Sequence, residues 1–301
     1  MDHPNTRPVE LLYRPAAPLR LRPHTRGNYR QTCDVVYAEA HGVGLIMDVF
    51  APVSDSSGIG VVDIVSGGWF SDRTLLNEHI GFGILDALCE RGITVFAVSP
   101  GSMTLFDGPA MVRHIHAAIR HIKANAARYG VAPQRLGLLG VSAGGHLGAL
   151  AALAPKPARM NARDPLRHWD TRVAAAAVFF PPSDLLDYGG KRFDHFRFEG
   201  FDFTPILFHG GVDDKSDAEI VERLIALSPA RMPAADAPPF MIVHGKADVV
   251  VPWEQAEKLA EAVRRAGGQA TLRYNETGGH VWPNIHIEVE EAADWLLNRL
   301  L

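Results

Sequence analysis

The chain alternates short apolar segments with segments of helical periodicity, and this alternation limits the possible folds more than any other feature. The apolar segments are nearly continuous, so both faces of each predicted strand should be buried. The predicted strands cover 61–65, 93–98, 135–139, 173–180, 240–243 and 270–274. The predicted helices cover 75–90, 109–129, 143–153, 253–266 and 285–300. Such a series predicts an α/β fold, with a mostly parallel central sheet and helices on both of its faces.

The segment before this series has a different pattern. Residues 1–30 contain five prolines and scattered arginines without a sustained period. We therefore predict an extended N-terminal arm over 1–30 and one α/β domain over 31–301. Residues 32–38 and 45–50 are β-prone, and the residues between them include two glycines, which predicts a leading antiparallel hairpin.

One connection is much longer than the others. Residues 183–238 separate two predicted strands, whereas a parallel crossover needs only about a dozen residues. Long insertions are often lids or substrate-binding loops, and a packed insertion with its own small core is the alternative. The insertion has a helix-like pattern over 218–227 and is rich in phenylalanine: Phe193, Phe196, Phe198, Phe201, Phe203 and Phe208.

Composition narrows the classes of partner. Hydrophobic residues make up 47% of the chain and charged residues 21%, as is usual for a chain that buries a large core. With a net charge of −4, the chain has no overall positive potential that would attract nucleic acid or an anionic membrane. The sequence has no run of about 18 apolar residues that would predict a membrane span, and the N-terminus lacks the apolar region of a signal peptide. We expect a cytoplasmic protein; secretion after removal of a signal peptide stays open as an alternative.

The two cysteines, Cys33 and Cys89, lie in different predicted elements and have no metal-binding spacing. Reduced thiols are expected, and a disulfide is the alternative. Neither a metal nor a cofactor is predicted from these residues.

A serine lies in the turn between a predicted strand and a predicted helix. Gly140-Val141-Ser142-Ala143-Gly144 matches G-x-S-x-G, which forms a nucleophile turn when a strand precedes it and a helix follows. The flanking glycines permit a turn so tight that the hydroxyl is lifted above the sheet, at the positive end of the next helix. We predict that Ser142 is a nucleophile; the alternative is a serine that only caps the helix.

A serine hydroxyl needs a base, and the base needs an orienting acid. On such a sheet the order is serine, acid and histidine, each in a loop after a strand. Asp248 follows the strand 240–243 and His280 follows the strand 270–274. We therefore predict Asp248 as the acid and His280 as the base.

Other residues compete for these two roles. Asp213, Asp214 and Asp236 are alternative acids, but they lie in the insertion and follow no predicted strand. His244 is expected to support the acid loop through hydrogen bonds. His146, one turn after the serine, faces either the core or the cleft.

Attack on a carbonyl produces an oxyanion that backbone N–H groups must stabilise. One donor is expected from Ala143, and the others from Gly67, Gly68 and Trp69 in the loop after the first central strand. Adjacent glycines let this loop turn its amides toward the oxyanion without a side chain in the way.

Together these residues resemble the α/β-hydrolase superfamily, and within it the esterase/lipase group that includes hormone-sensitive-lipase-like and feruloyl- or acetyl-esterase-like enzymes. The resemblance runs from about residue 61 to the C-terminus and includes Gly140–Gly145 followed by His146, Pro181-Pro182-Ser183-Asp184-Leu185, Ser228-Pro229, and Pro238-Pro239 leading into His244–Pro252. It implies hydrolysis of a small-molecule carboxylic ester by Ser142, Asp248 and His280, without cofactor or metal. One departure is that Val65-Ser66-Gly67-Gly68-Trp69 lacks the histidine that usually precedes these glycines.

Two other functions use the same residues or the same fold. The first is amide hydrolysis, as in aryl-formamidases or prolyl-oligopeptidase-like peptidases. The second is a binding protein that kept the fold without catalysis, and the complete serine, aspartate and histidine set argues against it.

Overall fold

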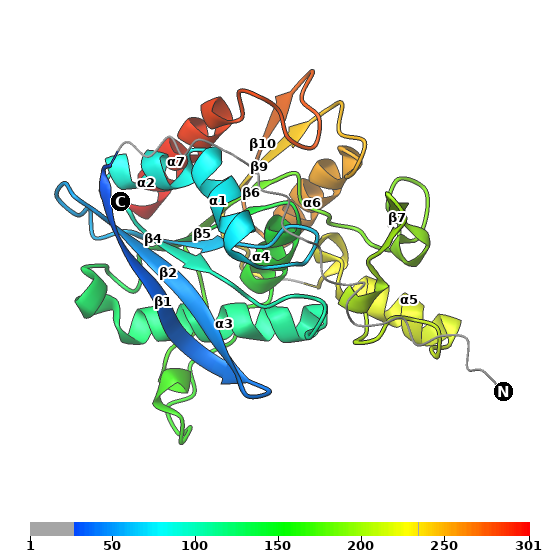
Figure 1. The fold of residues 1–301 in the computed structure, drawn as a ribbon, viewed down its shortest axis with the longest axis horizontal. Helices are drawn as coiled ribbons and strands as arrows, with labels where there is room; N and C mark the ends of the chain where they lie inside the picture. The colour runs from blue at the N-terminus through cyan, green and yellow to red at the C-terminus, as the bar shows by residue number, and fades with distance from the viewer. Residues whose placement is uncertain (1–26, 234) are drawn as a thin grey trace.

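The computed structural model describes residues 27–233 and 235–301, so most of the predicted N-terminal arm lies outside the described residues. The strands of the main sheet are β1 (Tyr29–Ala40), β2 (Val43–Pro52), β3 (Gly60–Ile64), β4 (Thr94–Val98), β5 (Leu136–Val141), β6 (Ala175–Phe179), β9 (Phe240–Gly245) and β10 (Ala270–Asn275). Their order is β1-β2-β4-β3-β5-β6-β9-β10 (Figure 1). The pairs β1·β2 and β2·β4 are antiparallel and the other pairs are parallel, which confirms the predicted hairpin and mostly parallel sheet.

Helices cover both faces of the sheet, as predicted. They are α1 (Arg73–Gly81), α2 (Ile84–Glu90), α3 (Gly108–Ala124), α4 (Ala143–Leu153), α5 (Asp217–Ala226), α6 (Glu254–Arg265) and α7 (His286–Leu300). Side chains alternate along each strand, so Val61 and Met241 pack with α1, α2 and α7, whereas Val62 and Ile242 pack with α3, α4 and α6. In Figure 1, α2 and α7 lie above the sheet and α3 lies below it.

Two predicted helices end earlier than expected. The pattern over 75–90 forms two helices, because Gly83 adopts a left-handed φ of 81° and ends the hydrogen-bond ladder between α1 and α2. The pattern over 109–129 ends as an α-helix at Ala124. There the side chain of Asn125 donates to the carbonyl of His121 at 2.8 Å, and a short 3-10 helix over Ala126–Tyr129 follows.

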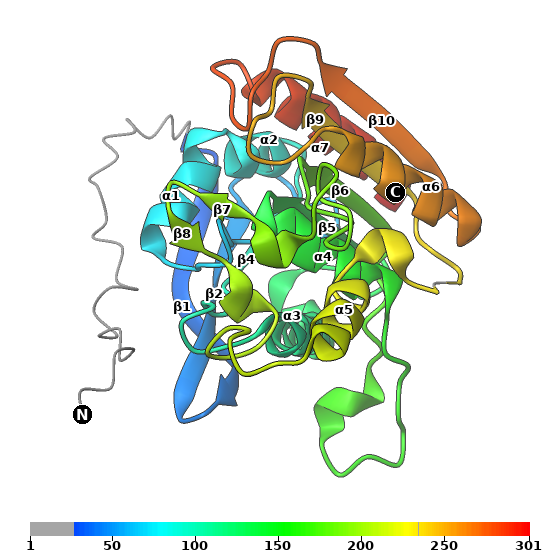
Figure 2. The same cartoon turned by 90° about the vertical axis from the view of Figure 1, so that its right-hand side faces the viewer.

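The insertion contains a short antiparallel hairpin, β7 (Arg197–Phe198) and β8 (Phe201–Asp202), followed by α5. Helix α5 begins with a capping box, in which the Ser216 and Glu219 side chains each bond the backbone of the other residue. Figure 2 shows the hairpin in front of the sheet and close to α1. A contact between the rings of Phe70 and Phe201, with centroids 5.8 Å apart, joins the hairpin to the segment before α1.

Parallel strands all end at the same edge of a sheet, and the loops that follow them meet there. In this chain the loops after β3, β5, β9 and β10 carry all the residues predicted for catalysis. The fold therefore explains how residues far apart in the sequence reach one place.

Candidate active site

Ser142 is the only residue between β5 and α4, and its backbone is strained. Its φ of 52° lies in the left-handed region, which a residue with a Cβ rarely adopts. A Cβ at Gly144 would lie 2.2 Å from the carbonyl oxygen of Ile64, and one at Gly140 would lie 2.5 Å from the carbonyl oxygen of Gly144. Both flanking positions thus need glycine, which is the physical reason for the G-x-S-x-G spacing here.

The structure brings together the three side chains predicted as nucleophile, base and acid. The Oγ of Ser142 lies 3.0 Å from Nε2 of His280. The Nδ1 of the same ring lies 2.9 Å from Oδ2 of Asp248. The three side chains, in the loops after β5, β9 and β10, thus form one continuous line of hydrogen bonds.

The Asp248 carboxylate is fully buried and has several partners. Its Oδ1 accepts from the amides of Val250 at 2.8 Å and Val251 at 2.9 Å. Its Oδ2 also lies 3.4 Å from Nε2 of His244, the residue predicted to support this loop. Burial raises the pKa of Asp248, but hydrogen bonds from His244 and His280 outweigh this effect and hold the pKa below its ordinary value. The carboxylate of Asp248 is therefore ionised beside His280.

A phenylalanine that the sequence did not single out packs on the base. The rings of Phe180 and His280 have centroids 4.6 Å apart. Phe180 has a φ of 36°, and its amide donates to the carbonyl of Val243 at 2.6 Å. A strained aromatic residue at the end of β6 thus limits the positions that the imidazole can take.

The loop after β3 forms a two-residue turn. Gly67 and Phe70 exchange two backbone hydrogen bonds of 3.0 and 2.9 Å, and the residues between them, Gly68 and Trp69, have φ of 54° and 61°. Two consecutive positive φ values in such a pair are those of a type I′ turn. The amide of Gly67 is therefore occupied. Within the described residues the amides of Gly68, Trp69 and Ala143 make no hydrogen bond outside regular secondary structure.

His146 faces the interior and is completely buried. Its Nδ1 accepts from the indole N–H of Trp69 at 3.0 Å, and its Nε2 donates to the carbonyl of Leu227 at 2.7 Å. The sequence left its direction open; the structure places it between α4, the turn after β3 and the end of α5.

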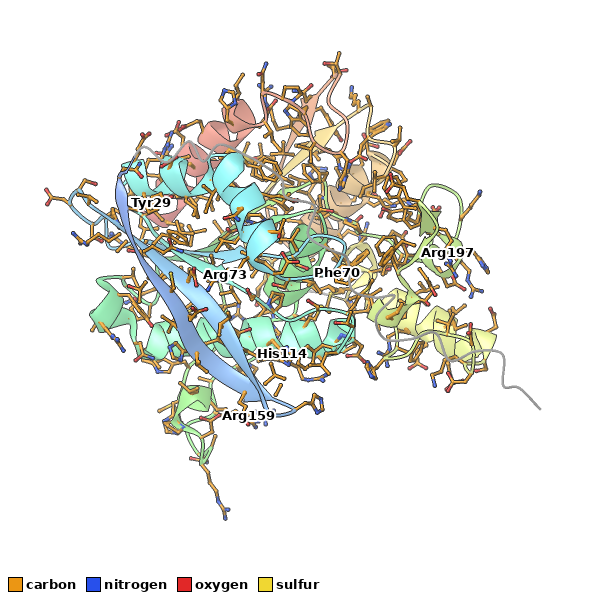
Figure 3. All side chains as sticks on the ribbon, viewed as in Figure 1. Tyr29, Phe70, Arg73, His114, Arg159 and Arg197 are labelled. Atoms are coloured by element: carbon orange, nitrogen blue, oxygen red, sulfur yellow. The ribbon has the colours of Figure 1, made fainter. Side chains whose placement is uncertain are left out.

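A cavity of about 410 Å³ opens beside Ser142 and His280. The turn after β3, helix α1 and the insertion form its walls. Ten aromatic residues are among those that line it: Trp69, Phe70, Phe82, Phe180, Tyr188, Phe193, Phe196, Phe198, Phe201 and Phe203. In Figure 3, Phe70 lies near the centre of the molecule, whereas Arg197 lies at the outer edge of the insertion.

The insertion phenylalanines line the cavity and also pack on one another. The ring of Phe196 stacks on Phe193 and on Phe203, with centroids 5.5 and 6.0 Å apart. Phe208 is apart from this group and lies against the guanidinium of Arg223 at 4.4 Å. The same side chains therefore line the cavity and form a packed cluster within the insertion.

A second histidine–aspartate pair borders the cavity, and sequence reasoning missed it. Nδ1 of His79 lies 2.8 and 3.0 Å from the two carboxylate oxygens of Asp63, which is fully buried in the middle of β3. His79 lies on α1 and lines the cavity. An aspartate inside an apolar strand was the signal in the sequence.

The remaining predictions concern residues outside this cluster. Asp213, Asp214 and Asp236 are exposed on the insertion and do not contact His280. Cys33 and Cys89 are both free thiols. Among residues 27–233 and 235–301, no helix has the length and apolar character needed to cross a membrane, and no group of side chains is arranged to hold a metal ion.

Comparison with known proteins indicates the family of the chain. Residues 47–263 match the BD-FAE family. The probable carboxylic ester hydrolase LipM of Mycobacterium tuberculosis is 28% identical over 81% of this chain and 54% of its own length. Esterase LipQ of the same organism is 27% identical over 90% of this chain and 61% of its own length. The chain thus spans little more than half of these relatives.

A solved structure described as a truncated form of a carbohydrate esterase from gut microbiota has the same fold. It superposes with a TM-score of 0.75 at 22% identity, and the match covers 91% of this chain and 98% of that one. With a family match over most of its length, the chain belongs to the BD-FAE family, within the esterase/lipase group of the α/β-hydrolase superfamily.

Proposed function

We propose that the protein is a carboxylic-ester hydrolase in which Ser142 forms an acyl-enzyme. The observation that carries this proposal is the hydrogen-bonded line from Ser142 to His280 to Asp248, with distances of 3.0 and 2.9 Å, at one side of an aromatic cavity. The esterase names of LipM and LipQ support an ester rather than an amide as the substrate.

In the first half-reaction Nε2 of His280 takes the proton of the Ser142 hydroxyl while Oγ attacks the ester carbonyl. The resulting tetrahedral intermediate collapses, the imidazolium gives its proton to the alcohol oxygen, and the alcohol leaves. In the second half-reaction water loses a proton to the same nitrogen and attacks the acyl group. The acid then departs and Ser142 regains its proton.

Asp248 keeps the imidazole in the correct tautomer. Its carboxylate accepts a hydrogen bond from the Nδ1–H group, so Nε2 of His280 is left with a lone pair toward Ser142. The charge of the carboxylate also stabilises the imidazolium that forms during attack. Ionisation at neutral pH follows from its low pKa.

For the oxyanion we propose the amides of Ala143, Gly68 and Trp69 as donors. Gly67 has a different task, because its amide already bonds Phe70 and closes the turn. The histidine that usually precedes the glycines is not needed for this arrangement, since the donors are backbone groups.

The experiment that tests the proposal uses a fluorophosphonate probe and short p-nitrophenyl esters. The wild type should react with the probe and hydrolyse the esters, and Ser142→Ala should do neither. Equal labelling of the two proteins would disprove the assignment of the nucleophile. A panel of N-formyl aromatic amides and proline peptides separates ester from amide hydrolysis: faster turnover of an amide than of any ester would overturn the substrate class.

A further inference from the structure

We propose that His146 is a positioning residue that links the insertion to the oxyanion turn, so that the insertion influences the rate of acyl transfer. This inference rests on the proposed function. It concerns how the turn Gly67–Phe70 keeps its shape rather than which residue attacks the ester.

The two hydrogen bonds of His146 determine its tautomer. Trp69 Nε1 is only a donor, so Nδ1 of His146 must be the acceptor in the 3.0 Å contact. The carbonyl of Leu227 is only an acceptor, so Nε2 must carry the proton in the 2.7 Å contact. Only a neutral imidazole with its proton on Nε2 satisfies both partners. One ring therefore joins α4, the turn and the C-terminal end of α5.

The surroundings keep this ring neutral. His146 is completely buried, no carboxylate among the described residues contacts it, and burial lowers its pKa to about 4. Protonation at Nδ1 would break the bond to Trp69, and the low pKa prevents this at neutral pH.

Trp69 needs such a support because its backbone is strained. A φ of 61° is unusual for a residue with a bulky side chain, and the turn keeps this conformation only if the surroundings hold it. The indole is held at its N–H by His146 and on its ring by two insertion residues. The centroids of Phe193 and Phe203 lie 5.2 and 5.8 Å from that of Trp69.

Each of these three contacts of the indole thus involves the insertion, directly or through His146. Phe193 and Phe203 belong to it, and His146 is itself held by Leu227 near its end. A shift of the insertion changes the orientation of the turn whose amides face the developing oxyanion. Contacts that improve the oxyanion geometry act on the transition state, so the link should affect kcat more than KM.

Two substitutions at one position separate the two hydrogen bonds. In His146→Asn the amide oxygen replaces Nδ1 and keeps the acceptor for Trp69, but the bond to Leu227 is lost. In His146→Gln the amide nitrogen replaces Nε2 and keeps the donor for Leu227, but the acceptor for Trp69 is lost. Trp69→Phe removes the same bond from the other side, and Trp295→Phe on α7, outside the cavity, is the matched control.

We expect Trp69→Phe and His146→Gln each to lower kcat on p-nitrophenyl esters by roughly tenfold to a hundredfold, less than or similar to the loss of one oxyanion donor. KM should stay within about twofold in His146→Gln, since His146 does not line the cavity. The variant that combines Trp69→Phe with His146→Gln should be no slower than the slower of the two single variants. Both substitutions remove the same hydrogen bond, the one between Trp69 and His146. His146→Asn should keep several times more kcat than His146→Gln because it keeps the acceptor for Trp69, but it should stay below the wild type because it breaks the link to the insertion at Leu227. Trp295→Phe should match the wild type.

Thermal unfolding of each variant separates positioning from folding. If kcat follows the order of unfolding temperatures rather than the presence of the Trp69 bond, the inference is wrong. It is also wrong if Trp69→Phe keeps kcat within about twofold of the wild type. Activity in Ser142→Ala would instead overturn the proposed function, so the two failures are distinguishable.

Discussion

Two histidine–aspartate pairs border the same cavity and have nearly the same internal geometry. In each pair the Nδ1 of a histidine lies within 3.0 Å of a buried carboxylate, His280 with Asp248 and His79 with Asp63. The side chain of His280 is 24% exposed and its Nε2 contacts Ser142. The side chain of His79 is only 4% exposed, and no serine contacts it among the described residues.

The difference comes from where the residues lie on the sheet. Asp248 and His280 follow the ends of β9 and β10, where loops can present a side chain to the cavity. Asp63 lies inside β3, and His79 reaches it from α1. We therefore expect the same pair of side chains to serve proton transfer at a strand end, and attachment of a helix to the sheet in the middle of a strand.

The largest expected effect is on turnover. His280→Ala removes the base, and we expect kcat on p-nitrophenyl esters to fall by about three to six decades. His79→Ala, the matched change in the second pair, should cause a far smaller loss. Equal losses from the two substitutions would mean that both pairs take part in catalysis.

Asp248→Asn should lower kcat by about four decades, because the amide no longer accepts the Nδ1 proton and the wrong tautomer of His280 is favoured. The fold should survive, since the asparagine oxygen still accepts from the amides of Val250 and Val251. Steady-state kinetics beside circular dichroism checks both statements. A folded variant that keeps a tenth of the wild-type rate would assign the acid to another residue.

The second pair should matter for stability. His79→Ala leaves the carboxylate of Asp63 buried without its partner, which typically costs about 3–5 kcal/mol of unfolding free energy. Urea unfolding measures this loss. Replacement of both residues by leucine should recover part of it, because no unpaired charge remains. A loss below about 1 kcal/mol in His79→Ala would show that the pair does not hold α1 to the sheet.

The smallest effect concerns a histidine without a carboxylate. Burial lowers the pKa of His146 to about 4, whereas an unfolded histidine has a pKa of about 6.5. Between these values the unfolded chain binds a proton that the folded protein does not, so the unfolding free energy falls as the pH decreases through this window. Above about pH 6.5 the residue adds no pH dependence.

His146→Gln tests this expectation. Across this pH window the unfolding free energy of the variant should change less steeply with pH than that of the wild type. The difference between the two slopes should correspond to at most one bound proton. His116, with a pKa also lowered to about 4, contributes equally in both proteins. Identical slopes would contradict the low pKa of His146.

Local patterns made much of the fold predictable. Continuous apolar strands with helices between them indicated the layered sheet, because a strand that is buried on both faces does not alternate apolar and polar residues. The break at Gly83 was not predicted, since one glycine inside a helical pattern also occurs in unbroken helices. The ends of helices depend on caps such as Asn125, whose side chain makes its bond only in the folded chain.

The candidate site likewise has residues that the sequence pattern predicts and contacts that it does not. Ser142 could be predicted from five adjacent residues. The steric requirement at Gly140 is local, because a Cβ there would meet Gly144, whereas a Cβ at Gly144 would meet Ile64 on β3. Asp248 and His280 followed from the order of strands and loops. The contacts of His146 with Trp69 and Leu227, 77 and 81 residues away, had no local pattern that would predict them.

The sequence alone therefore determined the layered α/β architecture, the serine in its tight turn and the candidate acid and base, since each depends on short-range geometry or on chain order. Only the tertiary structure decided that His146 faces the interior, which amide of the Gly67–Phe70 turn is already occupied, and that the insertion phenylalanines both wall the cavity and support Trp69. Those features depend on the distances between side chains from separate elements, which are determined when the layers pack together.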